Sequence, residues 1–115
     1  MPHYRWDEVP REQMNPNIAR RVVHCERLTL AHLEIKKGGI VPLHDHHHEQ
    51  VTYVLRGRLR FRTGGHDQEV GPGEILATPP GAPHMVEALE DTVCLDVFTP
   101  VRDDWQRGED AYLRG

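Results

Sequence analysis

Residues Gly38 to Gly57 read G-G-I-V-P-L-H-D-H-H-H-E-Q-V-T-Y-V-L-R-G, in which a histidine tract separates two apolar runs. Side chains at positions i and i+2 of a strand project from the same face of a sheet, so we expect His44 and His46 to converge on one point. Neutral imidazoles that converge in this way commonly bind a transition metal ion. The stretch therefore predicts a metal site carried by a β-strand.

A second stretch, from Gly73 to His84, reads G-E-I-L-A-T-P-P-G-A-P-H and closes a turn of proline and glycine with one more histidine. His84 would supply a third nitrogen ligand, and the side-chain amide of Gln50 would supply an oxygen. Such a set leaves coordination positions free. Free positions are typical of sites that carry out chemistry or bind ligands, because structural metal sites are closed by four protein ligands.

Both stretches resemble the two signature motifs of the cupin superfamily, in its small single-domain form of the cupin 2 type. The positions in register are Gly38, His44, His46, Gly57, Gly73, Pro79, Gly81 and His84. Two positions depart from the motifs. Gln50 stands where a glutamate ligand is usual, and Ala88 stands where the second motif usually ends in asparagine.

The glutamine narrows the resemblance to one group of cupins. The run H-x-H-x-H-E-Q, followed by Y-V-L-x-G, is similar to the KdgF-like pectin-degradation cupins, which convert unsaturated uronates to their linear form. Further similar runs are M-N-P, E-R-L-T-L-A and L-D-V-F-T-P-x-R-x-D, so the resemblance covers nearly the whole chain. It implies an all-β double-stranded β-helix, the cupin jelly-roll barrel, and the metal ligands His44, His46, Gln50 and His84.

The fourth ligand has two alternatives next to Gln50. His48 has the same parity as His44 and His46, so it would replace Gln50 if the strand ran straight through the tract. A turn after His46 would carry His48 past the metal, and the register of the glycines then favours Gln50 over Glu49.

The order of short apolar runs agrees with this fold. Runs separated by glycine and proline are typical of an all-β sandwich or barrel, and many short strands around a small cavity suit a jelly roll. The expected strands are 21–24, 28–35, 40–44, 50–55, 58–62, 68–70, 74–78, 84–88 and 93–99. We expect a single domain over residues 1–115, with an N-terminal arm at 1–20, the barrel at 21–100 and a C-terminal tail at 101–115.

Composition and charge limit where the protein can be expected in the cell and which kinds of partner it can be expected to bind. A net charge of −4 and a pI near 6.1 over 115 residues argue against a nucleic-acid partner. No apolar run has transmembrane length, and the start M-P-H-Y-R-W-D-E lacks the apolar core of a signal peptide, so we expect a cytoplasmic protein. Cys25 and Cys94 are expected to be free thiols packed in strands. Cupins of this length commonly pair, and an exposed sheet edge is a physical reason to do so, which indicates a homodimer.

The neutral ligands also affect the chemistry of the ion. Three imidazoles and an amide oxygen leave a divalent ion with its full charge of about +2, whereas a glutamate would cancel about half of it. The site should then act as a Lewis acid toward oxygen atoms of a ligand. Zinc, nickel, iron, manganese and cobalt all suit these ligands, and the order of affinities does not choose among them.

Asp96 is unusual because it interrupts the apolar run V-C-L-D-V-F at 93–98, where a carboxylate would lose its water. It could be a structural residue paired with a backbone amide or an arginine, or a general acid/base beside the metal. In the uronate-linearising cupins, an aspartate, a phenylalanine two residues on and an arginine six residues on resemble Asp96, Phe98 and Arg102. The resemblance implies that Asp96 transfers a proton, and that Phe98 and Arg102 contact the substrate, with Arg102 holding its carboxylate.

Three hypotheses for the function follow. The first is a metal-dependent enzyme that opens the ring of 4,5-unsaturated uronate monosaccharides, small acidic sugars, to the linear keto form. The second is another metal-dependent cupin enzyme, a dioxygenase or an isomerase acting on a small organic acid. The third is a non-catalytic cupin that binds a metal or a sugar.

Overall fold

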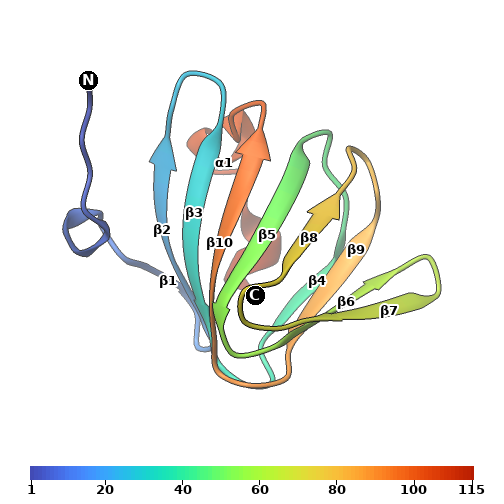
Figure 1. Ribbon diagram of the computed structural model, residues 1–115. Helices are drawn as coiled ribbons and strands as arrows, with labels where there is room; N and C mark the ends of the chain where they lie inside the picture. The colour runs from blue at the N-terminus through green and yellow to red at the C-terminus, as the bar shows by residue number, and fades with distance from the viewer.

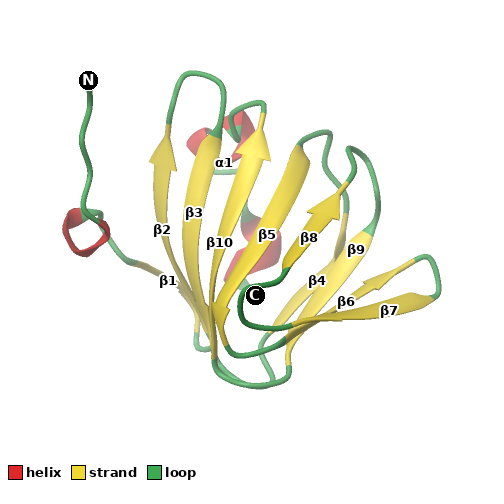
Figure 2. Cartoon of the chain, viewed as in Figure 1, coloured by secondary structure: helices red, strands yellow, loops and turns green.

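The computed structural model describes residues 1–115, and Figures 1 and 2 show that most of its regular secondary structure is β-strand. The elements are η1 (Trp6–Glu8), β1 (Glu12–Asn15), β2 (Ile18–His24), β3 (Thr29–Ile35), β4 (Ile40–His44), β5 (Glu49–Arg56), β6 (Leu59–Thr63), β7 (His66–Val70), β8 (Ile75–Thr78), β9 (His84–Ala88), β10 (Thr92–Thr99), α1 (Asp103–Gln106) and α2 (Ala111–Arg114). The prediction of an all-β, single-domain jelly roll is confirmed. None of the helices has the length and apolar character needed to cross a membrane.

The strands form two antiparallel sheets that lean toward each other (Figure 1). One sheet has the order β1-β2-β3-β10-β5-β8, and the other has the order β4-β9-β6-β7. Side chains alternate between the interior and the outer face, as the period of two in a strand requires. In β10, for example, Cys94, Asp96 and Phe98 are buried, while the residues between them are half-exposed.

A turn at Gly57 joins β5 to β6 and shows why a glycine brackets the histidine tract. Gly57 has a φ of +91°, and a Cβ atom placed there would lie 2.3 Å from the carbonyl oxygen of Asp91. Only glycine tolerates both the positive φ and so close an approach of the backbone. The glycine therefore fixes where β5 ends relative to the loop before β10.

The nine expected strands correspond to β2 through β10, and the differences lie at the ends of the chain. Residues 12–15 form β1 and residues 18–20 already belong to β2, so the arm expected at 1–20 is only the segment before β1. Asn15 explains the additional hairpin, because its Oδ1 accepts hydrogen bonds from the backbone N–H of Asn17 and of Ile18. This side chain closes a tight turn between β1 and β2. The short, polar sequence of β1 gives no pattern from which the hairpin could be predicted.

The tail expected at 101–115 contains two short helices that pack onto the barrel. Trp105 and Leu113 are buried in the hydrophobic core. Asp110 forms an ion pair with Arg20 of β2 at 2.5 Å, and the Nδ2 group of Asn15 donates to the carbonyl oxygen of Leu113 at 2.9 Å. These contacts hold the C-terminal segment against the first strands.

Both cysteines are free thiols, as expected, but only one is packed. Cys94 is buried in β10, where it faces the core. Cys25 is exposed, because β2 ends at His24 and the chain turns there toward β3.

Candidate metal centre and adjoining cavity

Three histidines meet where the two neighbouring strands β4 and β9 pair. His44 is the last residue of β4 and lies opposite His84, the first residue of β9. His46 lies in the loop just beyond β4, so the turn, rather than strand parity, brings it to the cluster. One nitrogen of each ring lies within 4.8 Å of a nitrogen of the other two.

Hydrogen bonds to the backbone fix which nitrogen of each ring can bind an ion. The Nδ1 atoms of His44, His46 and His84 lie 2.8, 2.9 and 2.8 Å from backbone carbonyl oxygens. A carbonyl oxygen only accepts, so each Nδ1 must carry the proton and donate it. The Nε2 atom of each ring therefore keeps its lone pair, which is the arrangement seen in histidines that bind metals.

Two further observations show that these residues fit a divalent cation. The Nε2 atom of His84 is buried and has no hydrogen-bond partner. The Nε2 atom of His46 lies 3.1 Å from Oε1 of Gln50, whose amide Nε2 instead donates to Oγ1 of Thr52 at 3.1 Å. Two lone pairs that face each other at this distance repel unless a positive charge lies near both.

Burial keeps the clustered imidazoles neutral. Loss of water lowers the pKa of His44 and of His46 to about 4, and it also lowers the pKa of His84. The neutral form is the one that binds a metal ion, so the rings do not have to release a proton at neutral pH.

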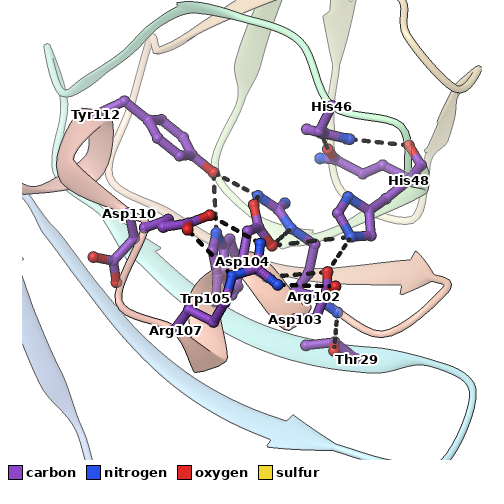
Figure 3. A network of polar contacts seen from close by, with 12 residues as sticks. Thr29, His46, His48, Arg102, Asp103, Asp104, Trp105, Arg107, Asp110 and Tyr112 are labelled. Carbon is purple, nitrogen blue, oxygen red and sulfur yellow. Dashed lines mark hydrogen bonds and ion pairs between the residues drawn. The ribbon is translucent and has the colours of Figure 1, made fainter.

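Of the alternatives for a fourth ligand, only Gln50 places a side-chain oxygen or nitrogen next to the Nε2 atom of a clustered histidine. Glu49 is exposed. His48 is buried, but its Nε2 atom is 3.2 Å from the carbonyl oxygen of Val101, and its carbonyl oxygen accepts the bond from His46 (Figure 3). His48 therefore connects the loop that carries His46 to the start of the C-terminal segment.

Asp96 lies deep in the same region. Its side chain is 6% exposed, and Oδ1 accepts a hydrogen bond of 2.6 Å from Oγ1 of Thr52, which in turn accepts one from Gln50. No arginine forms an ion pair with it. Burial raises the pKa of Asp96 to about 6, although hydrogen bonds from Thr52 and Gln50 and the charge of Arg102 oppose the shift.

Arg102 is held rigidly by several neighbours (Figure 3). Its Nε and Nη2 atoms donate to the two carboxylate oxygens of Asp104 at 2.9 and 2.8 Å, and Nη2 also donates to the Tyr112 hydroxyl at 3.0 Å. The guanidinium lies 4.6 Å above the ring of Phe98 and 4.2 Å from that of Trp105. The Nη1 group makes no hydrogen bond, so this end of the guanidinium is available to a ligand.

These groups line a single cavity of about 40 Å³. Its polar lining comprises His44, Gln50, Thr52, His84, Asp96, Arg102 and Tyr112, and apolar side chains form the rest of the wall. All the expected site residues line this cavity except His46, which belongs to the histidine cluster and contacts Gln50. Sequence reasoning assigned no role to Thr52, Asp104 or Tyr112, although Thr52 and Asp104 fall within runs that resemble family motifs, whereas Tyr112 does not.

Comparison with known proteins agrees with this architecture. Residues 31–98 match the family model of the cupin domain. The chain is 32% identical over 80 residues to the uncharacterized protein MJ1618 of Methanocaldococcus jannaschii, covering 69% of the chain and 61% of that protein. It is 29% identical over 77 residues to the oxalate decarboxylase OxdC of Bacillus subtilis, covering 63% of the chain and only 20% of that enzyme.

Among solved structures, KdgF from Halomonas sp. superposes with a TM-score of 0.80 at 29% identity. The match covers 86% of the chain and 94% of KdgF. This similarity therefore extends over almost the whole of both proteins, unlike the partial match to oxalate decarboxylase.

Proposed function

The chain belongs to the cupin family, and we propose that it is a metal-dependent enzyme that opens the ring of 4,5-unsaturated uronate monosaccharides to the linear keto form. One observation carries the proposal. Three of the four neutral metal ligands, a buried carboxylate and an arginine with a free donor face one cavity, and the fourth ligand, His46, clusters with His44 and His84. The likeness to KdgF over nearly its whole length supports this activity over that of oxalate decarboxylase.

We assign the metal ligands to His44, His46, His84 and Gln50, which would hold a divalent zinc, nickel, iron, manganese or cobalt ion. Bound there, the ion would supply Lewis acidity toward the oxygen atoms of the sugar. The chain contributes the orientation of these ligands, because the backbone carbonyls of Pro42, His48 and Ala82 fix the three imidazoles.

Asp96 is the proposed proton carrier. Ring opening removes the proton of the hydroxyl on C1 as the bond from C1 to the ring oxygen breaks, and a proton is later added at C4 as the C5 keto group forms. The number of protons does not change overall, so one carboxylate can accept the first and return it. The bond from Thr52 holds Asp96 in place, and burial beside the cavity keeps bulk water away from the transfer.

Arg102 is the proposed clamp for the substrate carboxylate, through its free Nη1 group. Asp104 and Tyr112 occupy the other end of the guanidinium and position it, and Phe98 supports its face. A guanidinium held in this way pairs well with a planar carboxylate.

One activity screen tests the proposed function. Unsaturated galacturonate and mannuronate monosaccharides are incubated with the protein, with and without added metal, and loss of absorbance from the conjugated double bond is followed. Zinc or nickel should support turnover, and removal of oxygen should have no effect, because a Lewis acid needs no redox chemistry. Activity that disappears without oxygen, or that only iron or copper restores, would instead favour the dioxygenase hypothesis.

Replacing Arg102 tests the clamp. The Arg102→Ala protein should show a Michaelis constant for the uronate raised about tenfold or more and a lower turnover number, because binding and orientation fail together. Arg62→Ala is the matched control, since Arg62 is exposed and pairs only with Asp67 at the surface. An unchanged Michaelis constant in Arg102→Ala would remove Arg102 from substrate binding.

We also propose a homodimer. Three large apolar side chains are exposed on the outer face of the adjoining strands β5 and β8, namely Tyr53, Leu55 and Ile75, and Tyr53 pairs in register with Ile75. A second copy that packs on this face would cover them. Light scattering should give twice the chain mass of 13.2 kDa, and a mass of one chain would exclude the dimer.

A further inference from the structure

Tyr112 of α2 lies beside the candidate metal centre although it is far from the histidine motifs in sequence. Its ring stacks on that of His44, with centroids 4.6 Å apart and planes 27° from parallel. The side chain lines the cavity together with Asp96 and Arg102. Asp96 belongs to β10 in one sheet, whereas Tyr112 of α2 stacks on His44 of β4 in the other sheet, so the two groups line the cavity beside different sheets.

The Tyr112 hydroxyl accepts two hydrogen bonds, and its own hydrogen stays free to donate a third. Its oxygen accepts from Nη2 of Arg102 at 3.0 Å and from Nε1 of Trp105 at 3.2 Å (Figure 3). Both partners can only donate, so the hydroxyl hydrogen is not used in either bond. A phenol that accepts from a guanidinium is polarised and becomes a stronger donor.

We propose that Tyr112 is a further catalytic residue, whose hydroxyl donates a hydrogen bond to the ring oxygen of the uronate as that oxygen separates from C1. The inference rests on the ring-opening function proposed above. As the bond breaks, its electron pair stays on the ring oxygen, which becomes the enolate oxygen on C5. The proton released from the C1 hydroxyl goes to Asp96, and its return to C4 completes the isomerisation without an oxidant or a reductant.

A donor at this place would stabilise charge that exists only while the bond is breaking. Such a contact acts on the turnover number and hardly on the binding of the ground state. The neighbours of Tyr112 suit this role, because the stacked imidazole of His44 fixes the ring and the anchored α2 fixes the backbone.

The Tyr112→Phe protein tests the proposal, because phenylalanine keeps the stacking on His44 and removes only the hydroxyl. We expect the turnover number for the uronate to fall about ten- to a hundredfold, with the Michaelis constant changed less than about threefold and the metal content per chain unchanged. Tyr4→Phe is the matched control, since Tyr4 is exposed in the segment before β1, and it should keep wild-type kinetics.

The other outcomes separate the possibilities. A Tyr112→Phe protein with a wild-type turnover number would overturn the proposal and leave the ring-opening function intact. A raised Michaelis constant with normal turnover would mean that the hydroxyl only positions Arg102, and loss of metal would mean that it only supports His44; both results overturn a catalytic role. A wild-type protein that opens no unsaturated uronate would overturn the proposed function, and this inference with it.

Discussion

The His84→Ala protein should leave purification with little metal and should have almost no activity toward unsaturated uronates. The side chain removed is buried, and its Nε2 atom faces the cluster without any partner in the protein. Two imidazoles and an amide oxygen would then have to compete with water for the ion. Changes to residues that merely orient ligands cost about ten- to a hundredfold in affinity, so loss of a ligand should cost at least a hundredfold.

Metal content per chain, measured by mass spectrometry of the purified protein, checks this expectation. His66→Ala is the matched control, because His66 is an exposed histidine at the start of β7, outside the cluster. It should keep the wild-type metal content and stability. Full occupancy in His84→Ala would contradict the four-ligand site, whereas His44→Ala and His46→Ala should behave as His84→Ala does.

Local patterns predicted the barrel because each of the strands β2 through β10 carries its own signal. Alternation in β10 required Cys94, Asp96 and Phe98 to share one face, and the structure buries all three. The same period of two places Arg60 and Arg62 of β6, and Arg58 just before it, on the face opposite Leu59 and Phe61. In the structure these arginines pair with the acidic residues Glu69, Glu87 and Asp67 at the surface, while Leu59 and Phe61 are buried.

The contacts of the C-terminal segment could not be predicted in this way. Tyr112 reaches His44 across 68 positions of the chain, and Asp110 reaches Arg20 across 90. Such pairs depend on how the C-terminal segment folds back over the barrel. The alternation of apolar and polar residues within a strand carries no information about that fold-back. Arg102 illustrates the consequence, since the family resemblance suggested its role but not that Asp104 and Tyr112 would occupy its Nε and Nη2 groups.

The second large effect is expected for Asp96→Asn, which should keep its fold and its metal while turnover falls roughly a hundredfold or more. Asparagine has nearly the size of aspartate and can still accept the hydrogen bond from Thr52, but it cannot take up the proton of the sugar hydroxyl. Turnover, metal content and the circular dichroism spectrum are measured on the same preparation. Full activity of Asp96→Asn with an unsaturated uronate would assign Asp96 to structure alone.

The stability of the metal-free Asp96→Asn protein distinguishes a proton carrier from a residue needed for folding. Burial raises the pKa of Asp96 to about 6, above its usual 3.8, so the folded protein favours the protonated carboxyl. The stability that this provides is complete below about pH 4 and is lost as the pH rises through 6. Asparagine stays neutral, so Asp96→Asn should be more stable than wild type toward urea at pH 8, with the difference vanishing near pH 4. A variant less stable than wild type at pH 8 would show that the charged carboxylate supports the fold, and its low turnover would then reflect damage to the site and not the loss of a proton carrier.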